Sequence, residues 1–423
     1  MINLANIFSV SGFAADIQLA LNQALLGDNV VIPNSLSQPD GKWHWNGQTI
    51  SIPGGVNLLA TGLAGCDGHP NFIAYTPTTI IHNDKAPPWT NYPMFTVNGL
   101  NGKKTRISGI QLEATPPATL ADETTGTVSA IELDRAINFR VDHCTFIDFS
   151  GTAVFADANG GGGSGTCLGL IDHCINNNPY KDSNAGYLWA YGYYVRGNCL
   201  ATAPWEPVSS FFGKYNTIPG YATMYVEDCY FARNRHSLDA IEGGFYCSRY
   251  NMFELSACGY QAGYVDMHGA AGWQSGRGFE AYNNLAKGRP GNIKVDGSRC
   301  DAYDFQLRDG SALIYNNTFV CDPGNSSGNI FALLANDNAL ARKDIEVNNT
   351  FIWNNTYSNC QFVNNSGYYV ENKDYFLRAP IPADGFTYTP YPYPHPLISG
   401  LSIHSLAIAS PPLSNVPFTL QKI

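Results

Sequence analysis

The chain has 423 residues, of which only 14% are charged, while glycine (42), tyrosine (25) and phenylalanine (22) are abundant. This composition favours an extended β-structure with many turns over a helical bundle. The net charge of -10 disfavours nucleic acid and anionic membranes as partners. No apolar run approaches the roughly 20 residues of a membrane-spanning helix, and the N-terminus shows no signal-peptide pattern.

The first predicted element is a helix over residues 14–26, with Ile17, Leu21, Ala24 and Leu25 on one face. Gly27-Asp28 is a stop signal, and residues 30–33 then form a short buried strand. An amphipathic helix at this place can cover the first hydrophobic layer of a repeat array. An ordinary surface helix would show the same pattern.

A repeat becomes visible after Arg106, and its marker is a cysteine or an asparagine. An apolar or small residue usually stands three positions before the marker and a phenylalanine two positions after it. Periods of this size indicate a solenoid, and the β-branched and aromatic segments between turns indicate strands. Asparagine tolerates the left-handed backbone region, and buried cysteine behaves as a small hydrophobe. The markers are Cys144, Cys174, Asn198, Cys229, Asn251, Asn284, Asn317 and Asn349.

The marker ladder and the motifs at 226–231 (VEDCYF), 314–319 (IYNNTF) and 346–351 (EVNNTF) resemble the right-handed parallel β-helix superfamily typified by pectate lyases. The resemblance implies an all-β solenoid with an N-terminal capping helix, which we place over residues 1–375. The same fold carries lyases, hydrolases and phage tail proteins, so it leaves the activity open. Residues 376–423 contain a proline-dense stretch, and we expect them to form an extended strap packed on the solenoid.

In the resembling family, the ladder lies between the second and third strands of each turn. The first strand is then expected 12–18 residues before each marker. Counting back 16 residues from three successive markers gives Arg235, His268 and Asp301, with further ionisable residues close by. Adjacent turns would place these side chains on one face, about 4.8 Å apart from strand to strand. A solvated polar stripe is the alternative to a functional site.

Two reactions are compatible with this face. In β-elimination on a uronate polymer, Arg235 or Arg277 would neutralise the substrate carboxylate, and His236 or His268 would be the base. Hydrolysis requires two carboxylates that flank the scissile bond. The predicted catalytic residues are His236, His268, Arg235, Arg277 and Asp239, and the predicted substrate-binding residues are Asp266, Glu280, Asp301, Asp304, Trp273 and Tyr264.

The sequence therefore predicts an enzyme acting on an extracellular polysaccharide. The histidines and arginines place a polysaccharide lyase first, and the surplus of aspartates keeps a glycoside hydrolase as the alternative. A non-catalytic carbohydrate-binding or phage tail-spike protein is the third possibility. Such a protein would be extracellular or virion-associated, and monomeric or homotrimeric.

No cofactor or metal centre is predicted. Calcium remains possible because aspartates cluster, although no consecutive calcium-loop pattern is present. Asp142-His143 and Asp172-His173 occupy equivalent places in two copies of the repeat. We expect them to be stacked surface pairs, with cation binding as the alternative.

Overall fold

The structure is a computed structural model. It describes residues 5–67, 73–85, 93–99, 103–116, 129–158, 166–179, 181–182, 186–187, 191–197, 222–256, 263–267, 276–288, 305–308, 310–321, 329–333, 347–364, 367–385 and 388–399.

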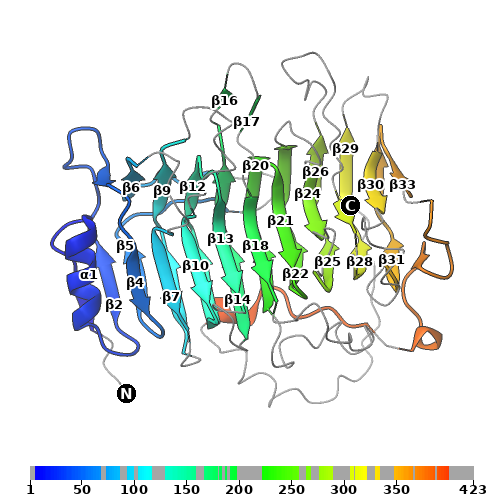
Figure 1. Ribbon diagram of the computed structural model, residues 1–423, viewed down its shortest axis with the longest axis horizontal. Helices are drawn as coiled ribbons and strands as arrows, with labels where there is room; N and C mark the ends of the chain where they lie inside the picture. The colour runs from blue at the N-terminus through cyan, green and yellow to red at the C-terminus, as the bar shows by residue number, and fades with distance from the viewer. Residues whose placement is uncertain are drawn as a thin grey trace.

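Three long parallel sheets run side by side along the molecule (Figure 1). Sheet 1, whose outer face carries the candidate site, has ten strands. They are β4 (Ile50–Pro53), β7 (Phe95–Asn98), β10 (Ile131–Asp134), β13 (Thr152–Asp157), β18 (Tyr191–Arg196), β21 (His236–Ile241), β24 (Gly263–Met267), β27 (Phe305–Leu307), β30 (Asn329–Leu333) and β33 (Gln361–Val363).

Sheet 2 has twelve strands and sheet 3 has ten. Sheet 2 contains β1 (Asn6–Phe8), β2 (Asn29–Ile32), β5 (Asn57–Ala60), β8 (Thr105–Ser108), β11 (Ile137–Asp142), β14 (Cys167–Asp172), β19 (Ala222–Glu227), β22 (Phe245–Arg249), β25 (Gly278–Tyr282), β28 (Ser311–Tyr315), β31 (Thr350–Trp353) and β34 (Tyr375–Phe376). Sheet 3 contains β3 (Trp43–Trp45), β6 (Ile80–Asn83), β9 (Gln111–Ala114), β12 (Thr145–Ile147), β15 (Ile175–Asn177), β20 (Tyr230–Asn234), β23 (Met252–Ser256), β26 (Leu285–Gly288), β29 (Thr318–Cys321) and β32 (Thr356–Ser358).

The chain visits sheets 1, 2 and 3 in turn, so hydrogen-bonded neighbours are strands of successive coils. This path is a right-handed parallel β-helix, and it confirms the predicted fold class and the architectural resemblance. A short antiparallel pair, β16 (Lys181–Asp182) with β17 (Gly186–Tyr187), lies outside the three sheets.

A buried asparagine ladder fixes the turn between sheets 2 and 3. The Asn251 backbone N–H donates to Asn284 Oδ1 at 3.0 Å, and the Asn284 N–H donates to Asn317 Oδ1 at 3.0 Å. Asn317 continues the ladder by donating to Asn355 Oδ1 at 2.9 Å. Each side chain thus satisfies a backbone donor that the tight turn would otherwise leave buried and unpaired.

Three details of the predicted repeat are wrong. The last ladder residue is Asn355, because it, and not Asn349, accepts the Asn317 N–H. The left-handed residue is the one before the marker, such as Asn283 (φ 56°) before Asn284. The copy assigned to Asn198 is not a repeat, because the strand that precedes it, β18, pairs within sheet 1. Asn198 itself lies outside the described residues.

Removing one ladder amide should be costly. Asn284→Ala deletes the bonds from Asn284 Nδ2 to Ser248 O and Asn317 Oδ1, and it removes the acceptor of the Asn251 N–H. Because these groups stay buried, we expect a loss of about 2–4 kcal/mol of unfolding free energy in urea titrations. Asn46→Ala, at an exposed position, should change it by less than about 0.5 kcal/mol. Equal losses in the two variants would refute the ladder's contribution.

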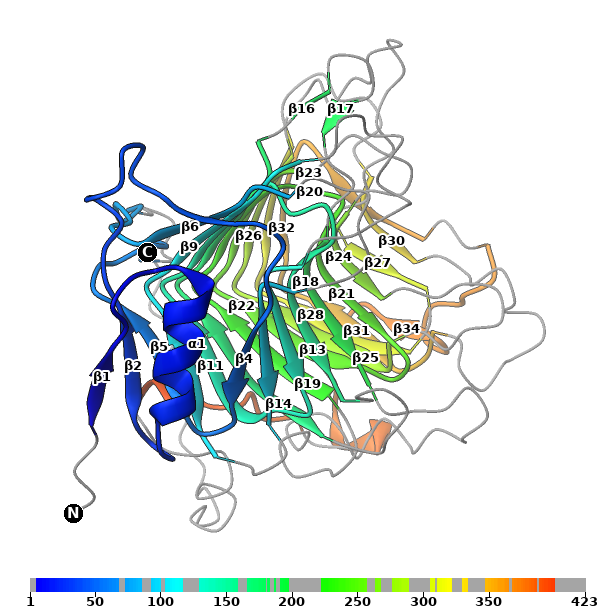
Figure 2. The same ribbon diagram turned by 60° about the vertical axis from the view of Figure 1, so that its left-hand side comes forward.

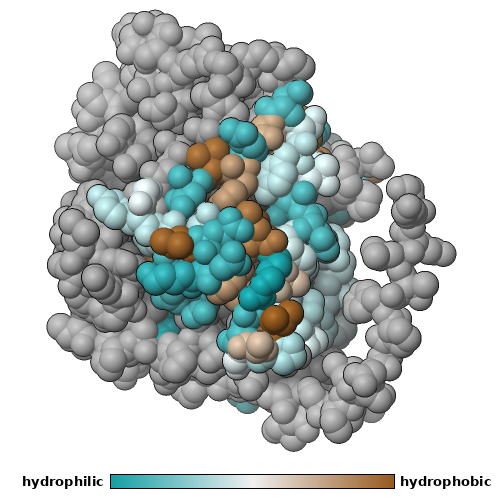
Figure 3. Space-filling model, turned by 90° about the vertical axis from the view of Figure 1, so that its right-hand side faces the viewer, coloured by the Kyte–Doolittle hydropathy of each residue, from teal (hydrophilic) through white to brown (hydrophobic). Residues whose placement is uncertain are grey.

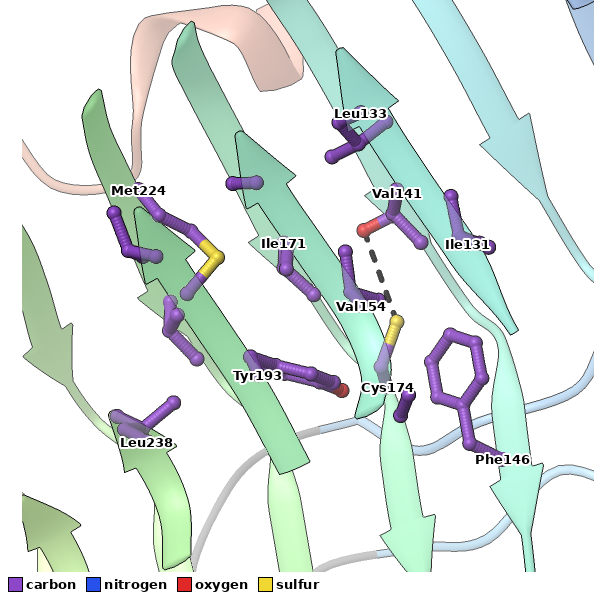
Figure 4. Close-up of a cluster of buried hydrophobic side chains, with 14 of the residues drawn as sticks. Ile131, Leu133, Val141, Phe146, Val154, Ile171, Cys174, Tyr193, Met224 and Leu238 are labelled. Atoms are coloured by element: carbon purple, nitrogen blue, oxygen red, sulfur yellow. Dashed lines mark hydrogen bonds between the residues drawn. The ribbon is translucent and has the colours of Figure 1, made fainter. Parts of the chain in front are cut away.

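The interior is filled by side chains that stack from coil to coil. Figure 4 shows Tyr193 from sheet 1 among Val154, Ile171 and Phe146, with Cys174 Sγ 3.7 Å from the Val141 carbonyl. Phe231 and Phe253 of sheet 3 stack with ring centroids 5.0 Å apart. The marker cysteines Cys144, Cys174 and Cys229 are free and fully buried, as small hydrophobic residues would be.

The helix α1 (Ala14–Gln23) closes the N-terminal end of the solenoid, as predicted (Figure 2). Ile17, Ala20 and Leu21 are its buried residues, and it packs on β2 and β4. Leu25 does not belong to the buried face, because the helix ends before it and its side chain is 74% exposed. At the opposite end, hydrophobic and hydrophilic residues are interspersed on the described surface (Figure 3).

The C-terminal segment, defined here as residues 388–399, runs back along the outer face of sheet 2 (Figures 1 and 2). Tyr388 Oη donates to Glu280 Oε2, Tyr391 packs on Tyr225, and Lys104 Nζ donates to the Leu397 carbonyl. The segment ends with a short 3₁₀ helix, η5 (Pro396–Ser399), and another, η4 (Pro382–Asp384), lies before the segment begins. The segment covers apolar residues that sheet 2 points away from the interior.

Candidate active site

Strand alternation in sheet 1 turns a group of ionisable side chains outward. On β21, Leu238 and Ala240 point into the core, so Asp239 between them points out. Asp266 has the same place on β24, between Val265 and Met267. The two strands pair in register with Asp239 opposite Asp266. The two carboxylates are therefore side by side because of the register, not because of a loop.

His236 completes this cluster from the beginning of β21. One ligand-type atom from each of His236, Asp239 and Asp266 lies within 4.8 Å of the other two, and all three residues have 0% exposure. His236 Nε2 is 3.5 Å from Asp266 Oδ2. Arg308, directly after β27, places Nη2 3.1 Å from the same oxygen. Asp266 is thus held between an imidazole and a guanidinium, which favours its ionised form.

Tyr191 and Arg235 flank the histidine. The Tyr191 ring lies over the His236 ring with centroids 5.4 Å apart, and Arg235 Nη1 donates to Tyr191 Oη at 2.7 Å. Burial raises the pKa of Tyr191 to about 12, against the opposing charge of Arg235. The tyrosine is therefore a neutral hydrogen-bonding group near neutral pH, and it fixes the position of Arg235.

An aromatic row extends from the cluster toward the N-terminal end. Tyr194 is in register with Asp239, and Phe155 is in register with Tyr194. The Phe155 and Tyr194 ring centroids are 5.6 Å apart. Burial, followed by the nearby charge of Asp239, raises the pKa of Tyr194 well above its usual value. Arg196 stands over Phe155 and is paired with Asp157.

The sequence-predicted residues fall into separate groups. His236, Arg235, Asp239 and Asp266 come together on the outer face of sheet 1. Arg277 is buried and directly precedes β25 of sheet 2, and Tyr264 is in the interior, where its ring stacks on Phe253 and its Oη donates to the Lys287 carbonyl. His268, Trp273, Asp301 and Asp304 lie outside the described residues.

Glu280 is on β25 of sheet 2, away from the other predicted site residues. Its Oε2 accepts hydrogen bonds from Tyr388 Oη at 3.2 Å and from Cys247 Sγ at 3.7 Å. Its Oε1 has no hydrogen-bond partner among the described residues. Burial raises the pKa of Glu280 to about 8, so this carboxyl is protonated near neutral pH.

Glu280→Gln should therefore flatten the pH dependence of stability. A carboxyl with a raised pKa in the folded state stabilises the fold less as pH rises from 4.5, its ordinary pKa, to about 8. We expect similar Tm values for the wild type and Glu280→Gln near pH 4.5. The variant should gain about 4 kcal/mol near pH 8. Thermal unfolding measured between pH 4.5 and pH 8 tests this expectation. Glu371→Gln, at an exposed site, is the control. Parallel profiles for wild type and Glu280→Gln would contradict the expectation.

Sequence reasoning missed Arg308, Tyr191 and Tyr194. Arg308 comes directly after β27 and binds Asp266 from the next strand along sheet 1. Tyr191 and Tyr194 lie on β18, a regular strand of sheet 1. A sequence signal was available, because the core residues Tyr193 and Val195 alternate with Gly192, Tyr194 and Arg196 on the other face.

The three clustered residues also form a ligand set for a cation, but they fit calcium poorly. Calcium takes six to eight oxygen ligands, whereas this cluster offers two carboxylates and an imidazole nitrogen. Arg308 already supplies a positive charge to Asp266 at 3.1 Å. A cation bound between the carboxylates would be repelled by that guanidinium, so no step is assigned to a metal.

The two Asp-His pairs are stacked, as expected from the repeat, but they are not surface pairs, because both aspartates have 0% exposure. The His143 and His173 rings are 5.0 Å apart and nearly parallel, and each Nδ1 lies 2.8 Å from the preceding aspartate. Arg140 binds both oxygens of Asp172 at 2.8 Å. The aspartates are occupied by these partners, and neither histidine belongs to a cluster of three ligands among the described residues.

No protein-family model matches the sequence, and no curated protein matches it. Among solved structures, the chain is similar to an alginate lyase from Paenibacillus sp. str. FPU-7 (13% identity, TM-score 0.48, covering 85% of this chain and 97% of that one). It is also similar to a DFA-IIIase from Arthrobacter chlorophenolicus A6 (11% identity, TM-score 0.45, covering 86% of this chain and 84% of that one). A third match is a Yersinia enterocolitica family 28 exopolygalacturonase (10% identity, TM-score 0.41, covering 88% of this chain and 73% of that one).

No helix in the described part of the chain is both long and apolar enough to cross a membrane. The architecture rests on the strand pairing of the chain itself: it is a right-handed parallel β-helix with a carboxylate pair on the outer face of sheet 1.

Proposed function

We propose that the protein cleaves glycosidic bonds of a polysaccharide on the outer face of sheet 1, by hydrolysis. The observation that carries this proposal is the carboxylate pair Asp239 and Asp266, in register on adjacent strands and within 4.8 Å of each other. Two carboxyl groups, one protonated and one ionised, are what glycoside hydrolysis requires.

The surroundings assign different roles to the two groups. Arg308 and His236 stabilise the charge of Asp266, so Asp266 acts as the ionised carboxylate. Two carboxylates this close repel each other when both are charged, which favours a proton on Asp239. Asp239 would then protonate the leaving glycosidic oxygen, while Asp266 activates water or attacks the sugar directly.

The aromatic row favours a polymer as the substrate. Phe155 and Tyr194 continue the line of Asp239 across neighbouring strands, so this line runs along the solenoid axis. Strands repeat about every 4.8 Å, close to the length of one sugar unit, and aromatic rings stack on sugar faces. A chain lying along this axis would place successive sugars over successive strands.

Elimination from a uronate polymer is the second candidate. Arg235 and Arg308 provide positive charge beside the cluster, as neutralisation of a uronate would need. It ranks second because the cluster contributes one described histidine but two carboxylates in register, and a carboxylate pair is what hydrolysis requires.

Incubation with a panel of neutral and uronate polysaccharides tests the proposal. New reducing ends without ultraviolet absorbance from an unsaturated product would support hydrolysis. Reducing ends accompanied by that absorbance would overturn it in favour of elimination. Binding without any product on the whole panel would overturn both reactions and favour a carbohydrate-binding protein.

A further inference from the structure

His395 anchors the C-terminal segment in a fully packed position. The residue is 1% exposed, and its ring contacts the rings of Tyr225 of β19 (centroids 4.7 Å apart) and Tyr391 (5.2 Å). His395 Nδ1 accepts the Leu397 backbone N–H at 3.1 Å. The neutral ring therefore carries its proton on Nε2, which has no hydrogen-bond partner among the described residues.

The charges around this ring are unfavourable for a cation. Arg249 of β22 and Arg140 of β11 are the nearby guanidinium groups that act on His395. The nearby carboxylates are engaged, because Glu227 binds Arg249 and Asp172 binds Arg140. Glu227 Oε2 accepts the backbone N–H of His395 at 3.0 Å, so it faces the main chain.

We propose that His395 is an acid-sensitive latch, whose protonation releases the C-terminal segment and exposes the apolar outer face of sheet 2. A proton on Nδ1 turns the acceptor of the Leu397 N–H into a donor, so that hydrogen bond is lost. The new positive charge also lies near Arg249 and Arg140. Arg249 donates to the carbonyls of Tyr391 and Pro392, so repulsion between His395 and Arg249 acts on a side chain that binds the backbone of the segment.

Burial, and then Arg249 and Arg140, lower the pKa of His395 well below 6.5. A depressed pKa in the folded state means that the stabilisation is complete above pH 6.5 and is lost as pH falls below it. Glu280 stays protonated over this range, whereas Glu227 and Asp228 work in the opposite sense to His395. Burial raises the pKa of Asp228 to about 6 and that of Glu227, which accepts the His395 N–H, to about 7. Acid therefore favours the buried state of both carboxyls, and the effect of His395 is isolated by comparison with its neutral variants.

Cys247 reports release of the segment directly. Its thiol is buried on the outer face of sheet 2 and donates to Glu280 Oε2, the same oxygen that Tyr388 Oη binds. Lifting the segment would uncover Cys247 while Cys144 and Cys174 stay inside the solenoid. Labelling at these cysteines thus separates local release from global unfolding.

The test is labelling with dithiodipyridine, a disulfide reagent that reacts in acid, with the sites and rates read by mass spectrometry. From about pH 7 to about pH 5, the ratio of Cys247 labelling in the full-length wild type to that in His395→Asn should rise at least about tenfold, with Cys144 protected. His395→Asn, whose Oδ1 can accept the Leu397 N–H without taking up a proton, is the reference. His395→Gln gives a second neutral variant with the same expectation.

Three results would overturn the latch. They are no rise of this ratio against His395→Asn, no rise of the same ratio against His395→Gln, and labelling of Cys144 in parallel with Cys247. The outcome does not depend on polysaccharide cleavage, because the measurement uses no substrate.

Discussion

Asp239→Asn and Asp266→Asn are each expected to lower kcat/KM on a cleaved polysaccharide by roughly 10³-fold, since general acid–base catalysis contributes about 10²–10⁴-fold. An asparagine at 239 cannot deliver a proton to the leaving oxygen, and an asparagine at 266 cannot act as base or nucleophile. The two residues work on one bond, so the double variant should lose little more than either single variant. Steady-state kinetics on the three variants measure this.

The matched control is Glu254→Gln. Glu254 is a partly buried carboxylate of β23 on sheet 3, in the same coil as β21, where it accepts from Tyr230 Oη at 2.8 Å. This variant should keep activity within about threefold, because a half-buried hydrogen bond contributes to stability and not to the reaction. Full activity in Asp239→Asn or Asp266→Asn, with unchanged Tm, would remove the pair from the mechanism.

Arg249→Ala is expected to be the most damaging change for stability, at about 3–5 kcal/mol of unfolding free energy. Arg249 has 0% exposure, binds Glu227 Oε1 through Nε and Nη2, and donates to the carbonyls of Tyr391 and Pro392. Truncation leaves the Glu227 charge buried and uncompensated, and it leaves two carbonyls of the C-terminal segment without their donor. Urea titration and thermal unfolding measure the loss.

Two further variants isolate the cause. Arg378→Ala breaks a surface pair, in which Arg378 is 37% exposed and binds Asp384, and should cost much less than Arg249→Ala because solvent screens this pair. Replacing both partners by apolar residues, Glu227→Leu with Arg249→Met, should recover only the part of the loss that comes from an unpaired buried charge, because the Tyr391 and Pro392 carbonyls still lack their donor. If Arg249→Ala costs no more than Arg378→Ala, the ion pair does not hold the segment.

The fold was predictable because each coil repeats one set of side-chain requirements. A small apolar residue, a turn and an aromatic residue recur, as at Val226, Cys229 and Phe231, and this spacing indicates the solenoid without any long-range information. The exceptions have physical causes. Asn355 replaces Asn349 in the ladder because hydrogen-bond geometry, and not the local motif, selects the residue that accepts the Asn317 N–H.

The site was predictable only where strand alternation controls it. Counting back from the markers placed His236, Asp239 and Asp266 in neighbouring coils, and the register brings them together. Counting back from the markers gave no information on Glu280. This residue is on β25 of sheet 2, the strand that follows β24 in the same coil, and its side chain contacts the C-terminal segment. Arg308 was missed because one arginine after a short strand has no sequence signature, and its role depends on reaching Asp266 across β24 and β27.

Cleavage of a susceptible polysaccharide in water labelled with heavy oxygen tests the central claim most directly. Hydrolysis by Asp239 and Asp266 predicts one labelled oxygen in the products for each bond broken, seen by mass spectrometry of oligosaccharide products. The Asp239→Asn variant should yield none above background. Unlabelled products in which one of the two new ends of each broken bond contains a double bond, so that the fragment carrying it is lighter by one water, would contradict hydrolysis and show that this face catalyses elimination.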